Sequence, residues 1–212
     1  MRNAEMGRSR GAAVSAGMKL KVGVMGSASS RLTKEHTRLA QSLGRALAEA
    51  GCITITGACP GFPFEAACGA SRAGGLVVGI SPGLSLWEHV RKYGSPTAYH
   101  DVLIFTGSGL MGREVVNIRS SDIVIILGGR SGTLGEFSIA YDEGKLIGVL
   151  MGTGGITTEM KHIVKVIKKN TGSKIIYDSD PEQLVTNLLA YYTKEHFRHP
   201  SCHHGRRMKR DA

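Results

Sequence analysis

Residues 121–136 have the sequence SDIVIILGGRSGTLGE, and this stretch decides the fold. Its five consecutive apolar residues, 123–127, predict a strand covered on both faces, because a half-exposed strand would alternate apolar and polar positions. The glycine-rich stretch 128–133 then predicts a tight turn into a helix. A buried strand that leads through glycines into a helix indicates an α/β protein, and such a turn can bind a phosphate group.

Apolar runs alternate with helical patterns along the rest of the chain. We expect strands at 20–25, 52–56, 76–80, 101–105, 122–127, 146–150 and 174–177, and helices near 33–50, 63–73, 109–120, 133–143, 157–169 and 181–193. Repeated strand–helix–strand units with right-handed crossovers predict a single doubly wound, mostly parallel Rossmann-type sheet with helices on both faces. The ligand of such a sheet binds outside the carboxyl ends of the strands.

The chain has 212 residues, a length that favours one domain. We expect a Rossmann-type nucleotide-binding domain at residues 18–193. Residues 1–17 are small, polar and aperiodic, which predicts a disordered leader, and translation could start at Met18 instead of Met1. Residues 194–212 are basic and predict a disordered tail.

The formal net charge of +10 raises nucleic acid as a partner, so its distribution matters. Residues 1–21 carry five basic and one acidic side chain, and residues 194–212 carry six basic and two acidic ones. Only about +2 is left for the body of the chain. The excess belongs to the two ends, and we do not expect a nucleic-acid partner.

The four cysteines, at positions 52, 59, 68 and 202, form no CxxC pair and match no common zinc-site spacing, so we expect reduced thiols. The tail contains histidine and cysteine side chains that are either metal ligands or simply solvated: His196, His199, Cys202, His203 and His204. We favour solvation and expect no metal site, because no periodicity fixes these side chains in one geometry. No apolar run is long enough for a membrane span or a secretory signal, which predicts a cytoplasmic protein without a membrane partner.

Three predicted strand-to-helix turns are rich in glycine and small residues, at 26–30, 57–61 and 128–133. Since all three should lie at one edge of the sheet, helix N-termini, backbone N–H groups and hydroxyls would surround a phosphate there. None of the turns is GxGxxG or GxxxxGK[ST], which disfavours a standard NAD dehydrogenase or a P-loop NTPase. The predicted ligand-binding residues are Gly26, Ser27, Gly57, Gly61, Gly129, Arg130, Ser131, Gly132 and Thr133.

Two charged residues near these turns have both structural and functional interpretations. Thr133 and Glu136 have the spacing of a capping box, in which the glutamate bonds back to the helix start. A carboxylate in the first helical turn is favoured in its ionised form, so Glu136 would be a poor proton donor and a better base or counter-charge to a cation. Arg113, on the preceding predicted helix, is either a surface residue or a bidentate ligand of a phosphate or carboxylate.

The segment from Arg113 to Glu136 resembles the LOG family, which includes cytokinin-activating enzymes and chains once named lysine decarboxylases. The family combines a helical arginine, a Ser-Asp pair that opens a strand, and the motif PGGxGTxxE. Here Arg113 lies nine residues before Asp122, and residues 128–136 (GGRSGTLGE) have the spacing of the motif. Further matches are Gly26-Ser27, Gly57, Gly61 and Gly79-Ile80-Ser81-Pro82, so that the resemblance covers about residues 18–193.

The resemblance implies a homodimeric or larger protein that binds a nucleoside 5′-monophosphate and, in active members, hydrolyses its N-glycosidic bond with Arg113 and Glu136 as the catalytic pair. An ionised Glu136 would stabilise the cationic sugar, and no further cofactor would be required. Lysine decarboxylation is not expected, because no lysine stands beside the phosphate turns to form a Schiff base.

The chain departs from the family pattern at Gly128, Arg130 and Glu114, where the family has proline, glycine and lysine. These departures resemble a sister branch near the molybdenum cofactor carrier proteins. The alternative function is therefore non-catalytic binding or carriage of a nucleotide-like ligand such as the molybdenum cofactor.

Overall fold

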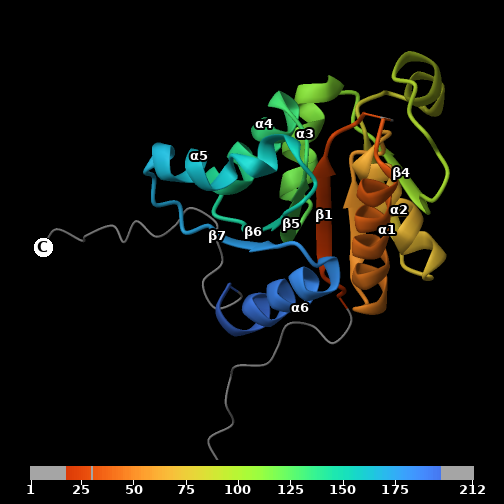
Figure 1. Ribbon diagram of the computed structural model, residues 1–212. Coiled ribbons are helices and arrows are strands. Elements are labelled where there is room, and N and C mark those ends of the chain that lie inside the picture. Colours follow the sequence, from red (N-terminus) through yellow and green to blue (C-terminus); the bar gives the residue numbers. More distant parts are fainter. Residues whose placement is uncertain (1–17, 30, 197–212) are drawn as a thin grey trace, which may run out of the picture.

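The computed structural model describes residues 18–29 and 31–196, and the chain there forms one parallel sheet between two layers of helices (Figure 1). The strands are β1 (Lys21–Gly26), β2 (Ile53–Thr56), β3 (Val77–Ser81), β4 (Val102–Phe105), β5 (Ile123–Leu127), β6 (Leu146–Leu150) and β7 (Lys174–Asp178). The α-helices are α1 (Lys34–Glu49), α2 (Phe62–Arg72), α3 (Gly109–Arg119), α4 (Ser131–Asp142), α5 (Met160–Ile167) and α6 (Pro181–Tyr191). The expected leader and all but the first three residues of the expected tail lie outside the described residues.

The strand order is β4-β3-β2-β1-β5-β6-β7, and every neighbouring pair is parallel. The predicted Rossmann-type α/β fold is therefore confirmed. From β1 the chain builds the sheet outward to β4, and then returns to the other side of β1 with β5. The crossovers diverge between β1 and β5, and this switch point is where a doubly wound sheet leaves a crevice at its carboxyl edge.

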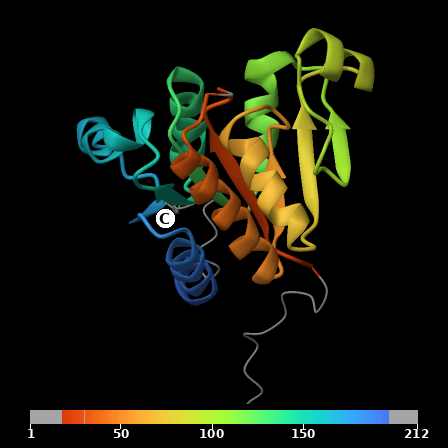
Figure 2. The same ribbon diagram turned by 45° about the vertical axis from the view of Figure 1, so that its right-hand side comes forward.

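The central strands are apolar throughout because helices cover both of their faces. In β5, Ile123, Ile125 and Leu127 pack with α1, α2 and α6, whereas Val124 and Ile126 pack with α3, α4 and α5. Figures 1 and 2 show the sheet running between these two helix layers. Alternation along the strand thus divides one continuous apolar run between two cores.

The chain departs from the expected helices at several places. The helix expected at 157–169 is divided into a 3-10 helix, Gly155–Thr158, and α5, which ends where Lys168 adopts φ of 51°. A π-helical turn, Tyr192–His196, extends α6 past the expected boundary at 193. Within the described residues, no helix is long and apolar enough to cross a membrane.

The connection from β3 to β4 holds only a short π-helix, Glu88–Lys92, instead of a full crossover helix. The edge strand β4 is consequently poorly covered, with Val102, Ile104 and Phe105 all exposed by more than a third of their surface. This leaves apolar surface at one edge of the sheet.

Leu43 tests the core between α1 and the sheet, where its side chain is fully buried. Leu43→Ala should lower the free energy of unfolding by about 2–5 kcal/mol, because it removes apolar contacts and leaves a cavity. Leu76→Ala, the same change at a side chain that is 40% exposed, is the matched control and should cost far less. Urea unfolding followed by circular dichroism measures both, and equal losses would contradict this account of the core.

Candidate functional site

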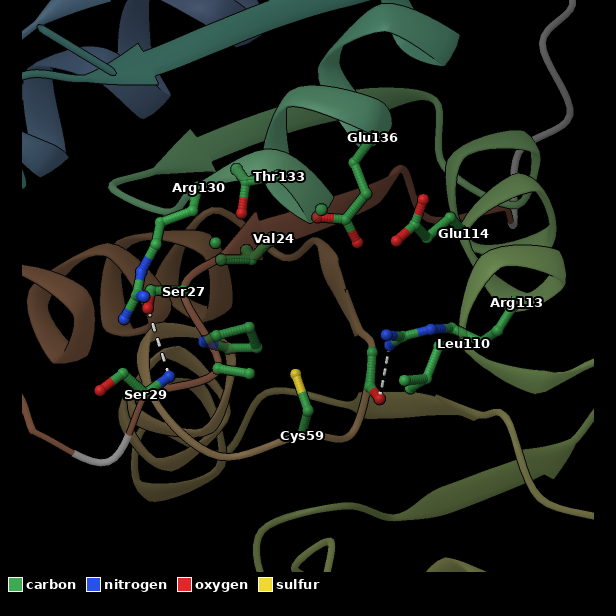
Figure 3. A pocket seen from close by; sticks show the side chains of 15 residues that line it. Val24, Ser27, Ser29, Cys59, Leu110, Arg113, Glu114, Arg130, Thr133 and Glu136 are labelled. Carbon is green, nitrogen blue, oxygen red and sulfur yellow. Dashed lines mark hydrogen bonds between the residues drawn. The ribbon is translucent and has the colours of Figure 1, made fainter. Parts of the chain in front are cut away.

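A pocket of about 500 Å³ opens at the switch point, outside the carboxyl ends of β1, β2 and β5 (Figure 3). The turns after these three strands and the first turns of α3 and α4 supply its walls. The volume is within the range of sites for small ligands. The lining residues are Val24, Gly26, Ser27, Ala28, Ser29, Gly57, Cys59, Pro63, Leu110, Arg113, Glu114, Arg130, Gly132, Thr133 and Glu136.

Most of the residues singled out in the sequence meet here. The predicted site residues that line the pocket are Gly26, Ser27, Gly57, Arg130, Gly132, Thr133, Arg113 and Glu136. Three do not: Ser131 is exposed at the start of α4, Gly129 lies against the side chain of Thr133, and Gly61 lines a neighbouring pocket. Gly61 caps α2 with φ of 80°, and a side chain there would collide with the backbone of Ser27.

Gly57 holds Arg113 in place. Its carbonyl oxygen accepts a hydrogen bond of 2.7 Å from Nη1 of Arg113, and a Cβ at position 57 would occupy the place of this nitrogen. Arg113 is only 7% exposed, which excludes the surface-arginine interpretation. Its Nε is buried without a hydrogen-bond partner among the described residues, so one donor of this cation is unsatisfied.

The end of the pocket near Arg130 suits an anion. Arg130 extends toward Ser27 and Ser29 in Figure 3, and no side chain caps the N-terminus of α4 beside it. The Oγ of Ser27 accepts a hydrogen bond from the Ser29 N–H at 3.2 Å, which orders this turn. A guanidinium, hydroxyl groups and a free helix N-terminus are the groups that bind phosphate in proteins.

The structure corrects the prediction for Glu136. Helix α4 begins at Ser131, two residues earlier than expected, and its N-cap is Arg130, so Thr133 and Glu136 do not form a capping box. Glu136 instead lies in the second turn, 7% exposed, without a hydrogen-bond partner in the described chain. Burial raises its pKa to about 7, Arg113 opposes this shift and Glu114 adds to it. The predicted fixed negative charge is therefore wrong, since near neutral pH a large fraction of this carboxyl carries a proton.

Glu114 and Cys59 also line the pocket, although sequence reasoning assigned them no role in it. Glu114 follows Arg113 on α3, is 6% exposed, and points toward Glu136 in Figure 3. Burial raises its pKa, and the neighbouring Arg113 opposes the shift. Burial likewise raises the pKa of the Cys59 thiol. The position of Glu114 directly after Arg113, the arginine of the LOG-like pattern, was the signal that could have identified it.

Among residues 18–29 and 31–196, no three His, Cys, Asp or Glu side chains gather as metal ligands. The histidines of the tail that were considered as ligands lie outside the described side chains.

Residues 19–185 match the model of the SLOG cluster4 family. The chain belongs to the SLOG cluster4 family. An uncharacterized protein of Archaeoglobus fulgidus is 37% identical over 134 residues, which are 63% of this chain and 82% of that protein. The family match and the similarity to solved structures confirm the prediction that the chain is a LOG-like relative with a Rossmann-type fold.

Solved structures extend the likeness. The molybdenum cofactor binding protein of Rippkaea orientalis is 27% identical with a TM-score of 0.68, over 82% of this SLOG chain and 97% of that one. The molybdenum cofactor carrier protein of Chlamydomonas reinhardtii is 27% identical with a TM-score of 0.66, over 81% and 99% of the two chains. The DNA processing protein A of Helicobacter pylori is 21% identical with a TM-score of 0.58, over 81% and 80%, and shares the fold.

The shifted pKa of Glu136 makes the stability of this SLOG protein depend on pH. Because the folded pKa of about 7 lies above the ordinary value of 4.5, the folded state holds a proton that the unfolded chain has lost between these values. Stability should therefore fall as the pH rises through this interval. Glu136→Gln removes the titration and should be more stable than the wild type at pH 8 by up to about 3 kcal/mol, with little difference near pH 4.

Urea unfolding of both proteins at several pH values measures this difference. Glu159→Gln, at an exposed position, is the matched control and should follow the wild type at every pH. A constant difference between Glu136→Gln and the wild type from pH 4 to pH 8 would contradict a raised pKa.

Proposed function

We propose that this protein binds a phosphorylated, nucleotide-like ligand in the pocket and holds it without cleaving it, as a carrier of the molybdenum cofactor. The observation that carries the proposal is the polarity of the pocket. Arg130 and Ser27 form an anion-binding end, while Arg113, Glu114 and Glu136 form a buried polar end. A ligand with a phosphate and a polar ring spans both ends. In this proposal the molybdenum cofactor is the transported ligand, and the protein requires no cofactor of its own.

The relatives support this choice of ligand. Two proteins that share about four fifths of the chain at 27% identity are described as a binding protein and a carrier protein of the molybdenum cofactor. The cofactor combines a pterin ring with a phosphate, which is the pairing of groups that the pocket favours. Binding of DNA, described for the DNA processing protein A, is not proposed, because at 21% identity that protein shares only the fold and the body of this chain carries a net charge of only about +2.

The charges of the pocket favour holding over cleavage. Loss of a base from ribose 5-phosphate builds positive charge on the sugar, and a fixed carboxylate would stabilise it. Glu136 has a pKa of about 7 and is not a fixed charge. Arg113 is bonded to the Gly57 carbonyl, so that only part of its guanidinium can face a ligand.

A second candidate function is hydrolysis of a nucleoside 5′-monophosphate, as the LOG resemblance implies. The meeting of Arg113 and Glu136 in one pocket, from α3 and α4, favours it. A carboxyl with a pKa of about 7 is also suited to act as a general acid toward a departing base. In this candidate the protonated form of Glu136 is the active one.

Binding and turnover distinguish the two functions. Purified protein is mixed anaerobically with molybdenum cofactor released from a molybdoenzyme, and with a panel of nucleoside monophosphates. We expect molybdenum to coelute with the protein, and ligands to bind without release of free base. Arg130→Ala should weaken binding of phosphorylated ligands by about tenfold, because it removes a charge-assisted hydrogen bond.

Arg91→Ala, at an exposed position outside the pocket, is the matched control for the loss of one positive charge. Release of base that disappears in both Arg113→Ala and Glu136→Gln would establish the hydrolase instead. Absence of binding by every phosphorylated ligand and by the cofactor would overturn the proposal.

We also infer that two copies of the chain associate through the uncovered edge of the sheet. Exposed apolar side chains occur on β4, on the connection from β3 to β4 and on α3: Leu84, Leu86, Trp87, Val90, Val102, Ile104, Phe105, Leu110, Met111 and Val116. Leu110 also lines the pocket. So many exposed apolar side chains are typical of an association surface.

Sedimentation velocity tests the association. The wild type should sediment as a dimer or a larger assembly, and Ile104→Lys should shift it toward the monomer, because the charge would be buried unpaired. Val166→Lys changes a side chain that is 63% exposed on α5 and should leave the assembly unchanged. A monomeric wild type, or equal effects of the two variants, would contradict an interface at β4.

A further inference from the structure

The buried end of the pocket holds two carboxyl groups and a single cation. Glu114 reaches it from α3 and Glu136 from α4, both less than a tenth exposed, and Figure 3 shows the two side chains pointing toward one another. Neither forms a hydrogen bond or ion pair within the described residues. Their oxygens are not among the fully enclosed side-chain atoms that lack a partner, so they open to the pocket, where a ligand that supplies hydrogen-bond donors can reach them.

The helix that faces Glu114 leaves room for its carboxyl group. A Cβ at Gly135 would lie 3.3 Å from one of its oxygens, and a Cβ at Gly132 would lie 3.7 Å from the other. Two glycines in the first turns of α4 thus keep the surface beside this carboxyl free of side chains. The carboxyl of Glu114 therefore lies close to the backbone of α4 and still lines the pocket.

The chemistry of a carboxylate selects the ligand edge. An ionised carboxylate has two oxygens and accepts two parallel N–H bonds, as it does from an arginine. A 2-amino-4-oxopyrimidine edge, which guanine and pterins share, presents a ring N–H and an exocyclic NH₂ side by side. Adenine presents a ring nitrogen acceptor next to its NH₂ group and would face the carboxylate with one repulsive contact.

We propose that Glu114 is the specificity-determining residue of the pocket and selects ligands with a 2-amino-4-oxopyrimidine edge. The inference rests on the proposed function, because it takes the ligand's phosphate to lie at the end formed by Arg130 and Ser27. The ring then extends toward α3, where Glu114 accepts its N–H and NH₂ groups. Glu136 faces the part of the ligand between ring and phosphate.

Three nucleotides that differ only in this edge test the proposal: GMP, IMP and AMP. IMP lacks the 2-amino group and keeps the ring N–H, so it should bind the wild type about 10- to 100-fold more weakly than GMP, the effect of one charge-assisted hydrogen bond. AMP should bind more weakly still, since it leaves an oxygen of Glu114 opposed to an acceptor. Isothermal titration calorimetry measures all three.

Glu114→Gln changes the edge that the protein presents with almost no change of volume. The amide offers one donor and one acceptor, which pairs with adenine and mismatches guanine. The variant should lose about 10- to 100-fold in affinity for GMP while AMP binding is unchanged or improved. Glu159→Gln, exposed and outside the pocket, is the matched control and should bind all three nucleotides as the wild type does.

Neopterin, which carries the same edge without a purine, identifies the source of the ring. Competition with GMP that is lost in Glu114→Gln supports the shared edge. The affinities of neopterin and guanosine, which both lack a phosphate, show whether the pocket favours a pterin or a guanine. Equal affinities of the wild type for GMP, IMP and AMP would overturn the inference while leaving the proposed function standing.

The remaining outcomes are also decisive. An equal loss for all three nucleotides in Glu114→Gln, with unchanged circular dichroism, would assign Glu114 a general role and overturn selectivity. If the variant does not fold, the comparison of GMP with IMP on the wild type still decides. If no phosphorylated ligand binds the wild type at all, it is the proposed function that fails.

Discussion

The coverage of β5 on both faces is the constraint on which the rest of the structure depends. Because its alternate side chains belong to two separate cores, the strand can neither slip in register nor curl without exposing one of them. Its carboxyl end must therefore leave the sheet at a fixed point. Gly128 and Gly129 make that exit, with φ of 50° and 88°, values that proline cannot adopt. The position of α4, and with it Arg130 and Glu136, follows from this turn.

A second buried group fixes the opposite wall of the pocket. Arg113 comes from α3 and reaches across to the turn after β2, where the absence of a side chain at Gly57 gives its guanidinium room. The bond to the Gly57 carbonyl satisfies Nη1 of this buried cation, whereas Nε has no hydrogen-bond partner among the described residues. The positive charge of Arg113 also interacts electrostatically with the nearby carboxyl groups of Glu114 and Glu136. The site is thus built around an arginine whose local partners are incomplete.

The strands, the parallel sheet and the meeting of three turns at one edge could be predicted from the sequence. The apolar runs 123–127 and 146–150 are long and flanked by turns, so the buried strands and the parallel sheet were readily recognised. The turns after β1, β2 and β5 had to meet at one edge once the sheet was parallel. The role of Gly57 could not be predicted, because the glycine that holds Arg113 lies 56 positions away in the chain. Local spacing suggested that Gly57 belongs to a phosphate-binding turn, whereas its contact with Arg113, which is distant in the chain, determines the role of this glycine.

The error at Glu136 has the same physical origin. Thr133 and Glu136 fit a capping box by spacing, but the helix starts at Ser131, and the glutamate moves from the first turn into the second. There the helix N-terminus no longer offers it a hydrogen bond, and burial, which no local pattern encodes, determines its protonation. Glu114, which departs from the family pattern, is buried as well, and burial also raises its pKa. A lysine there would add a second cation beside Arg113, whereas a glutamate changes the end of the pocket from cationic to acidic. The selectivity proposed for Glu114 follows from this change of charge at one position beside Arg113.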